Sequence, residues 1–338
     1  QSYGIIMNIA GLGLKGKSLL KLADLSDQQM LGLIDLACQL KERKKRGEHL
    51  RSPLLHGRNI CLIFQKSSTR THCATVVAVL DEGGHTEYLG QNDIHFGKKE
   101  SVPDTAKVLG RMFDGILFRG FSQRTVEDLA KYSGVPVWNG LTDDWHPTQI
   151  LADLQTVREH FGTLKGLKLA FVGDGRNNVC NSLMVGCAMA GMDMVNVCPP
   201  ELAPDNAVLA LARQAAARNH CTVTVCHDPA QGVRGANVLY TDVWASMGEE
   251  SLFQKRLELL RPFQVNMDMV RQTGNLDCNR VIFLHCLPAF HDHNTEITKE
   301  IGALEVSDEV FEAPFSLVFD EAENRMHTIK AMIVASLT

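Results

Sequence analysis

Long hydrophobic runs and an excess of basic charge are both missing from this 338-residue sequence. The apolar stretches, such as residues 169–172 and 281–284, are far shorter than the roughly 20 residues that a helix needs to cross a bilayer, which argues against a membrane protein. Lys and Arg number 34 against 39 Asp and Glu, a net charge of −5, whereas proteins that bind nucleic acid through phosphate attraction usually carry net positive charge. We therefore expect neither a membrane nor nucleic acid among the partners.

The spacing of the ten cysteines lacks the signs of a disulfide framework or a metal site. No two of them form a CxxC pair, and most lie within apolar patterns, where a reduced cysteine behaves as a small hydrophobic residue. Reduced thiols of this kind predict a cytoplasmic protein. Charged tails and low-complexity tracts are missing as well, which argues against a disordered chain.

What the sequence does contain is a regular alternation of short apolar runs with amphipathic helical patterns, from about residue 59 onward. This alternation is typical of βαβ units around a parallel sheet, and the length suits two domains. We predict an α/β fold of two doubly wound domains with parallel sheets, joined by long helices, with a C-terminal helix returning to the first domain. The predicted domains are residues 1–150 together with 321–338, and residues 151–320. The predicted strands are residues 59–64, 86–89, 115–118 and 135–138 in the first domain, and 167–172, 193–198, 222–226, 238–240 and 281–284 in the second.

A cluster of hydroxyl and basic residues, Lys-Ser-Ser-Thr-Arg-Thr at 66–71, follows the first predicted strand and opens a helix. Backbone N–H groups at a helix N-terminus attract anions. Ser68, Thr69 and Thr71 add hydroxyl donors, and Arg70 adds a planar fork suited to phosphate. The segment predicts a phosphate site, although an ordinary helix cap beside a solvent-exposed arginine would show the same residues.

A second segment, His-Pro-Thr-Gln at 146–149, also stands where a helix begins after a strand. His146 and Gln149 can donate hydrogen bonds to a carbonyl oxygen there. Arg119 follows the strand at 115–118, and ligands of open α/β sheets bind at the carboxyl ends of strands. We therefore expect the two segments and Arg119 to meet in one crevice.

Together, Ser-Thr-Arg-Thr and His-Pro-Thr-Gln resemble the carbamoyl phosphate signature of the aspartate and ornithine carbamoyltransferases. The resemblance continues over nearly the whole chain, through DTAKVLGRMFD, VPVWNGLTD, GDGRNN, TDVWASMGEE, FLHCLPAFHD and ENRMHTIKA. The Ser-Met-Gly element at 246–248 and His-Cys-Leu-Pro at 285–288 are similar to the ornithine branch. Ala289 stands where the aspartate branch has an arginine that holds a second carboxylate. The resemblance implies carbamoyl transfer to ornithine without a cofactor or metal.

The resemblance also implies ligand contacts, residue by residue. Those implied for carbamoyl phosphate are Ser68, Thr69, Arg70, Thr71, His95, Arg119, His146, Gln149, Cys286, Leu287 and Arg325; those for ornithine are Asn178, Asp242, Ser246 and Met247; and those in the chemistry itself are Arg70, His146, Asp242 and Cys286. His95 reaches the site of a neighbouring subunit in the family, which implies a homotrimer with shared sites.

Ornithine carries an α-ammonium, an α-carboxylate and a distal amine. The site must bind the first two groups and remove a proton from the third. Asp242 can pair with the ammonium group, while Asn178 and residues 246–247 can bind the rest of the amino-acid group. A free alkyl amine has a pKa near ~10.4, so an anion or thiolate must help to release the nucleophile. The resemblance assigns that role to Cys286 and Asp242. We expect the site to lie in the cleft between the domains and to close by movement of residues 246–248.

Other interpretations of the sequence remain open. A transferase for another amine, such as putrescine, an acylated ornithine or aspartate, would share most of these motifs. An NAD-binding Rossmann protein is a weaker alternative, because Gly-Asp-Gly at 173–175 lacks the third glycine of the fingerprint. A zinc site at residues 285–293 lacks the helical i, i+4 pair and a separate ligand cluster.

The basic run at 41–46 is interpreted as a solvated helix face. Gln65 and His72 replace an acidic and a basic residue of the family, a paired change that puts local rigidity in doubt.

Overall fold

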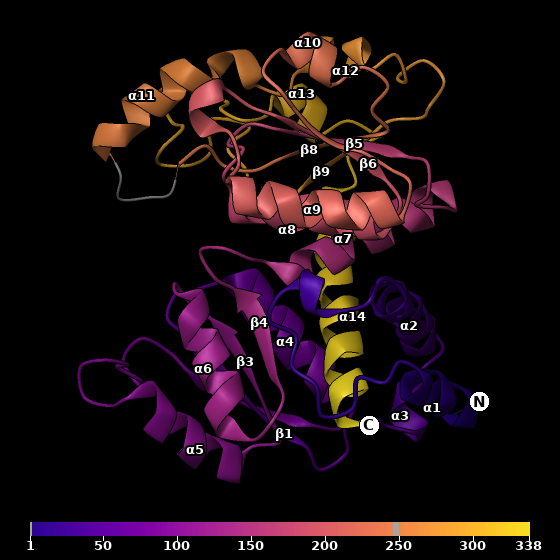
Figure 1. The fold of residues 1–338 in the computed structure, drawn as a ribbon, viewed down its shortest axis with the longest axis vertical. Coiled ribbons are helices and arrows are strands. Elements are labelled where there is room, and N and C mark those ends of the chain that lie inside the picture. The colour runs from indigo at the N-terminus through magenta and orange to yellow at the C-terminus, as the bar shows by residue number, and fades with distance from the viewer. Residues whose placement is uncertain (1, 246–249) are drawn as a thin grey trace. The chain divides into compact units, whose positions relative to one another are not determined.

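The computed structural model describes residues 2–245 and 250–338, and these form two compact units (Figure 1). Unit 1 comprises Gln1–Gln155 and Glu323–Thr338, and unit 2 comprises Thr156–Ala322. Each unit holds one parallel sheet surrounded by helices, so the predicted α/β class with two parallel sheets is confirmed. Ser246 and Met247, both predicted ornithine contacts, lie outside the described residues.

The sheet of unit 1 has the strand order β2-β1-β3-β4, with every pairing parallel. Five of the six residues of β1 are buried, as its continuous apolar run predicts for a central parallel strand. Helices α5 and α6 cover one face of the sheet and α14 lies on the other (Figure 1). The strands are β1 (Asn59–Phe64), β2 (His85–Leu89), β3 (Gly115–Arg119) and β4 (Val137–Leu141); the helices are α1 (Ser2–Gly11), α2 (Asp27–Lys45), α3 (Glu48–Arg51), α4 (Thr69–Asp81), α5 (Val102–Met112), α6 (Gln123–Ser133), α7 (Pro147–Phe161), which continues into unit 2, and α14 (Val318–Leu337), which begins there.

Strand β4 begins and ends later than the predicted 135–138. Asn139 and Gly140 are residue types typical of loops, yet both lie in the strand. The Asn139 amide donates to the Leu20 carbonyl at 2.9 Å and accepts from the Leu141 backbone N–H at 2.9 Å. A buried polar side chain is tolerated in a strand when its hydrogen bonds are made, and here the partners come from another part of unit 1 as well as from the strand itself.

The sheet of unit 2 has the order β7-β6-β5-β8-β9 and is also parallel throughout. Helices α8 and α9 cover one face, and α10 to α13 lie on the other (Figure 1). The strands are β5 (Lys168–Val172), β6 (Asp193–Val197), β7 (Val223–Cys226), β8 (Val238–Thr241) and β9 (Ile282–His285); the helices are α8 (Asn178–Met189), α9 (Asn206–Arg218), α10 (Pro229–Gly232), α11 (Glu250–Leu260), α12 (Met267–Gln272) and α13 (Asp308–Phe311). No helix in the described ranges combines the length and the apolar character needed to span a membrane.

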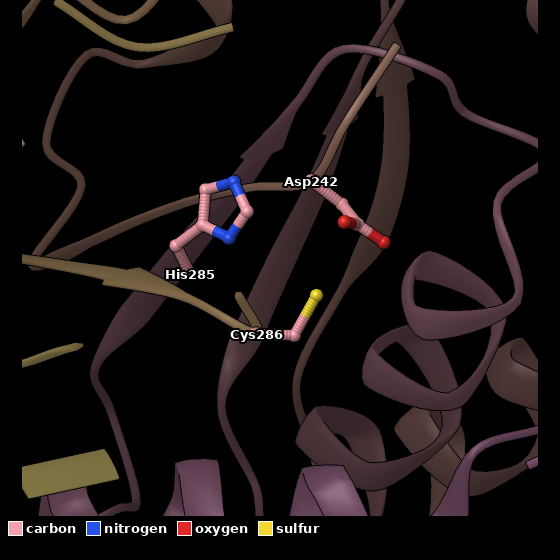
Figure 2. A group of neighbouring side chains, drawn as sticks. All are labelled: Asp242, His285 and Cys286. Atoms are coloured by element: carbon pink, nitrogen blue, oxygen red, sulfur yellow. The ribbon is translucent and has the colours of Figure 1, made fainter. Parts of the chain in front are cut away.

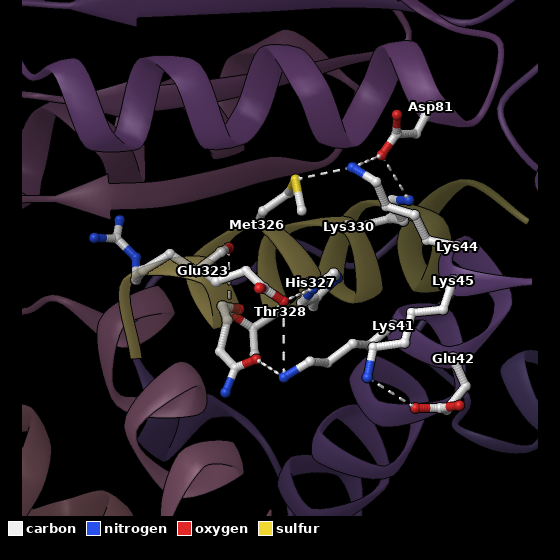
Figure 3. A network of polar contacts seen from close by, with 12 residues as sticks. Lys41, Glu42, Lys44, Lys45, Asp81, Glu323, Met326, His327, Thr328 and Lys330 are labelled. Carbon is white, nitrogen blue, oxygen red and sulfur yellow. Dashed lines mark hydrogen bonds and ion pairs between the residues drawn. The ribbon is translucent and has the colours of Figure 1, made fainter. Parts of the chain in front are cut away.

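The basic run at 41–46 is not simply a solvated face, which corrects the sequence interpretation. Figure 3 shows its lysines within a polar network that joins α2, α4 and α14. Lys41 donates to Asn324 at 2.9 Å, and Lys44 pairs with Asp81 at 2.7 Å. Arg43 is 4% exposed and pairs with the buried Glu82. Packing of α2 in unit 1 thus buries or partly buries Lys41, Arg43 and Lys44, whereas Lys45 and Arg46 are exposed as the sequence interpretation expected.

Cysteine burial also differs in part from the expectation. Cys61, Cys180, Cys187 and Cys198 are buried as predicted, and burial raises the pKa of the Cys61 and Cys198 thiols to about 12. Cys73 and Cys278, in contrast, are exposed, on the surface of α4 and in the segment before β9. Apolar sequence context thus predicted the interior correctly for four cysteines, and the remaining four, Cys38, Cys221, Cys226 and Cys286, are half-buried.

Candidate functional site

In unit 1 the candidate site lies at the carboxyl ends of β1 and β3. These strands are neighbours, but the chain passes from β1 to β2 on one side and from β3 to β4 on the other, so the strand order reverses between them. Ligands of open α/β sheets bind at such a point. Helix α4 begins just after β1, capped by Ser68, whose hydroxyl accepts from the Thr71 backbone N–H at 3.3 Å. Arg119 is the last residue of β3.

Two arginines converge on the buried hydroxyl of Thr71. Arg119 donates from Nη1 to Thr71 Oγ1 at 3.2 Å, and Arg325 donates from Nη2 to the same oxygen at 2.9 Å. Arg119 also donates to the Gly140 carbonyl at 3.4 Å. These acceptors are neutral oxygens, which position the guanidinium groups without cancelling their charge. The result is a concentration of positive charge beside a helix N-terminus, and this favours an anion with several oxygens.

Helix α7 contributes the opposite side of this cluster. Arg325 donates from Nη1 to Gln149 Oε1 at 2.8 Å and from Nη2 to Thr148 Oγ1 at 3.4 Å. Gln149 and Thr148 are 1% and 0% exposed, and Arg325 is 4% exposed although it carries a charge. Because all these contacts are sheltered from water, each charged hydrogen bond is stronger than it would be at the surface.

His146 stands directly before α7 and is also buried. Burial, together with the nearby charges of Arg325 and Arg119, holds the pKa of this imidazole well below its usual 6.5. His146 is therefore neutral at physiological pH. A neutral imidazole can donate one hydrogen bond to a substrate oxygen without adding a third positive charge.

The lowered pKa of His146 predicts a dependence of stability on pH. Below pH 6.5 the unfolded chain binds a proton at this position that the folded chain does not, so the free energy of unfolding falls as the pH drops through this range. One such proton contributes up to about 1.4 kcal/mol per pH unit. Urea unfolding between about pH 5 and pH 7.5 should show a shallower slope for His146→Asn than for the unaltered protein. Parallel curves would show that His146 titrates normally.

The other residues predicted for carbamoyl phosphate lie around this cluster or apart from it. Ser68 is half-buried, and Thr69 and Arg70 are exposed on the first turn of α4. His95 is half-buried in the segment between β2 and α5, where its backbone N–H donates to Glu100 at 3.4 Å. The structure thus brings Thr71, Arg119, Gln149 and Arg325 into direct contact, and the described hydrogen bonds do not join His95 or Arg70 to them.

In unit 2 a second group of side chains lies at the carboxyl ends of β5, β8 and β9, again where the strand order reverses. Asp242 directly follows β8, and its carboxylate accepts from the Asn177 amide at 2.9 Å and from the Val243 backbone N–H at 2.7 Å. Asn177 also caps α8 by accepting from the N–H groups of Val179 and Cys180. Asn178 is the first residue of that helix and half-buried. The Asp242 carboxylate is fixed by these hydrogen bonds beside an amide and can therefore bind an ammonium group.

Asp242 has two further neighbours, shown in Figure 2. A carboxylate oxygen of Asp242, a ring nitrogen of His285 and the Cys286 sulfur lie within 4.8 Å of one another. The Cys286 thiol points toward the carboxylate. Strands β8 and β9 are paired with Thr241 opposite His285, so the residues that follow them necessarily come close. This places a carboxylate and a thiol together at one end of the sheet.

These three side chains include ligand types that zinc prefers, and Asp242 adds one possible ligand from outside residues 285–293 to His285 and Cys286. Both ring nitrogens of His285 nevertheless have partners. Nδ1 accepts from the Leu287 backbone N–H at 2.9 Å, and Nε2 lies 3.3 Å from Glu305 Oε1. A metal ion would therefore have to displace one of these contacts. Leu287, predicted to contact carbamoyl phosphate, has φ +61°, a conformation that non-glycine residues rarely adopt and that clusters at functional sites.

The two departures at 65 and 72 do not leave the segment without support. The Gln65 amide oxygen accepts from the Phe121 backbone N–H at 3.2 Å. The His72 ring stacks on Tyr88 with centroids 4.1 Å apart and also contacts the Phe64 ring. Both replacement side chains therefore have contacts with neighbouring residues of unit 1.

Sequence reasoning missed three residues of these clusters: Thr148, Asp153 and Asn177. Asp153 is buried and accepts from Gln149 Nε2 at 2.9 Å, and its spacing of one helical turn from Gln149 was a readable signal. Asn177 stands beside the predicted Asn178 in the same motif. Thr148 had no signal apart from its place in the second segment.

Comparisons with protein families agree with both units. Residues 17–159 match the family model described as aspartate/ornithine carbamoyltransferase, carbamoyl-P binding domain. Residues 165–336 match the model described as aspartate/ornithine carbamoyltransferase, Asp/Orn binding domain.

Individual relatives and solved structures are similar along almost the whole length. A protein of Bacillus licheniformis named ornithine carbamoyltransferase, catabolic, is 55% identical over 96% of this chain and 98% of its own. An ornithine carbamoyltransferase of Streptococcus pyogenes is 54% identical over 96% of both chains. The structure of ornithine carbamoyltransferase from Pyrococcus furiosus superposes with a TM-score of 0.88 at 41% identity, covering 96% of this chain and 98% of that one. The structure from Gloeobacter violaceus gives a TM-score of 0.81 at 41% identity, covering 96% and 99%.

Proposed function

The chain belongs to the aspartate/ornithine carbamoyltransferase family and is a carbamoyltransferase that acts on ornithine, and we propose that the δ-amine of L-ornithine attacks the carbamoyl carbon of carbamoyl phosphate directly. The attack forms a tetrahedral intermediate, which collapses to L-citrulline and phosphate. The convergence of Arg119 and Arg325 on Thr71 carries the proposal, because it supplies the charge that the departing phosphate requires.

The cluster of unit 1 is assigned to carbamoyl phosphate. Arg119 and Arg325, with the N-terminus of α4 at Ser68 and Thr71, bind the phosphate oxygens. His146, which is neutral, donates to the carbamoyl oxygen as negative charge develops there, and Gln149 orients the carbamoyl amide. Thr69, Arg70 and Leu287 are assigned here on the family resemblance.

The cluster of unit 2 is assigned to ornithine. Asp242 pairs with the α-ammonium group, in a carboxylate orientation that Asn177 holds. Asn178 binds the amino-acid group from the start of α8, and Ser246 and Met247 are assigned to the same end on the resemblance. Cys286 lies beside Asp242 and helps to take the proton that the δ-amine must lose before it can attack. Because the new bond joins atoms of both substrates, residues of both units are needed for turnover.

The proposal is tested by incubating the protein with carbamoyl phosphate and one amine at a time, and measuring the ureido product. Turnover with L-ornithine is expected. The comparison amines are putrescine, an N-acylated ornithine and L-aspartate, since carbamoyltransferases for these share the phosphate motifs. Putrescine lacks the α-carboxylate of ornithine but keeps an ammonium group that Asp242 could bind, whereas N-acylated ornithine keeps the carboxylate and lacks the charged α-ammonium group assigned to Asp242. Turnover with putrescine and none with ornithine would overturn the assignment.

We also propose that the chain assembles as a homotrimer in which His95 reaches the carbamoyl phosphate of a neighbouring copy. Unit 1 carries large apolar side chains that are more than half exposed, Leu80 on α4 and Val108 and Met112 one turn apart on α5. Burying them against another copy would remove apolar area from water. Light scattering should give about three times the monomer mass of 37.3 kDa, and a monomer that retains full activity would contradict shared sites.

A reducing, cytoplasmic setting is proposed as well. The ten cysteines all lie in the described part of the chain and none is joined in a disulfide. In oxidising compartments the thiols of proteins commonly form disulfides, whereas in the cytoplasm protein thiols stay reduced. Attack, collapse and departure of phosphate involve no change of oxidation state, so the proposed reaction needs no redox cofactor.

A further inference from the structure

Asp153 is a fully buried carboxylate that the proposed reaction does not yet use. It lies on α7, one helical turn after Gln149, so the two side chains share a face of the helix. Gln149 donates from Nε2 to Asp153 Oδ1 at 2.9 Å, and its other amide atom, Oε1, accepts from Arg325 at 2.8 Å. Arg325 in turn donates to Thr71. A continuous chain of hydrogen bonds thus runs from Asp153 through Gln149 and Arg325 to Thr71. Thr71, Arg119, Gln149 and Arg325 are called the phosphate cluster below.

The chemistry of these groups allows only one orientation of the Gln149 amide. An ionised carboxylate accepts hydrogen bonds and a guanidinium donates them, so the amide between the two must turn its NH₂ to Asp153 and its oxygen to Arg325. If the Gln149 amide were reversed, its oxygen would face the carboxylate and its NH₂ would face the arginine. Both contacts would then be repulsive inside a buried site.

Resting on the proposed function, we infer that Asp153 is a positioning residue: it orients the Gln149 amide and, through it, fixes Arg325 for binding carbamoyl phosphate. Asp153 also supplies a negative charge two contacts away from Arg325, which compensates part of the cost of burying that arginine. The residue touches neither the phosphate nor the carbamoyl group in this assignment. Its influence passes through Gln149.

Two substitutions test this orientation. Asp153→Asn replaces a carboxylate, which only accepts hydrogen bonds, by an amide that can face Gln149 in either orientation. The Gln149 amide then no longer has a single favoured orientation. The KM for carbamoyl phosphate should rise about 10- to 100-fold, with a much smaller change in the KM for ornithine. A merely structural role would instead lower the melting temperature and the active fraction while both KM values stayed the same.

Gln149→Glu combined with Asp153→Asn provides the sharper test. In Gln149→Glu alone, two carboxylates face each other across 2.9 Å and binding should collapse. The double variant restores a complementary chain, because the new amide at position 153 can donate to the new carboxylate at position 149, and that carboxylate can accept from Arg325. Binding of inorganic phosphate, measured by isothermal titration calorimetry, should therefore be at least ~10-fold tighter in the double variant than in Gln149→Glu.

Gln155→Leu is the matched control, since Gln155 is equally buried on α7 but two positions further along, off the face of Gln149. It should leave both KM values unchanged. An Asp153→Asn protein with the normal KM for carbamoyl phosphate, or a double variant that binds phosphate no better than Gln149→Glu, would overturn the inference. Absence of ureido product from the unaltered protein would instead contradict the proposed function, whereas the phosphate titrations would still test whether Asp153 positions Gln149 and Arg325.

Discussion

Replacing Arg325 by Lys should lower kcat/KM for carbamoyl phosphate about 100- to 1,000-fold. The guanidinium of Arg325 uses two of its nitrogens to contact three oxygens, those of Gln149, Thr71 and Thr148. A lysine keeps the charge but presents one ammonium group, which cannot occupy both positions of the planar fork. Most of the loss should appear in the transition state, where the departing phosphate gains charge. Steady-state kinetics with each substrate varied in turn measures it.

Arg43→Lys is the matched control for this substitution. Arg43 is also 4% exposed, lies in the same unit and pairs with the buried Glu82, but it does not contact the phosphate cluster in any described hydrogen bond. The variant should lose about 1–3 kcal/mol of stability and keep its KM for carbamoyl phosphate. If the two variants lost activity equally, Arg325 would be acting on folding rather than on the substrate.

An Asp242→Asn variant is expected to lose about 100- to 1,000-fold in kcat/KM for ornithine while the KM for carbamoyl phosphate changes little. The carboxylate is held by Asn177 and by the Val243 backbone, so it meets the substrate ammonium without reorganising. Asparagine keeps the shape but removes the charge. It also removes the anion beside Cys286, which should slow deprotonation of the δ-amine and therefore lower kcat as well.

The control for Asp242 is Asp228→Asn in the same unit. Asp228 follows a strand too, and its carboxylate caps α10 by accepting from the Ala230 backbone N–H at 3.2 Å. Asparagine caps a helix as well as aspartate does, so stability and turnover should stay the same. An Asp242→Asn protein whose kcat/KM for ornithine lies within about 3-fold of normal would remove Asp242 from the proposed ammonium site.

Local pattern in the sequence was sufficient for most of the elements that position the site. Strand β1 follows from one continuous apolar run, and α4 and α7 follow from hydroxyl and proline residues at their starts. These signals are readable because a strand or helix cap depends on neighbours within a few residues. Strand β4 was placed too early, because burial of Asn139 depends on Leu20, more than a hundred residues away.

The sequence by itself thus determined the α/β class, the motifs at 66–71, 146–149 and 285–288, and the family to which they point. Only the tertiary structure decided that Arg325 meets Thr71 across 254 positions, that Arg43 is buried, and that Asp153 stands behind Gln149. Such contacts arise when helices that are distant along the chain pack on one sheet. Local propensity carries no information about them, since the free energy of a buried charge depends on which partners the packing brings to it.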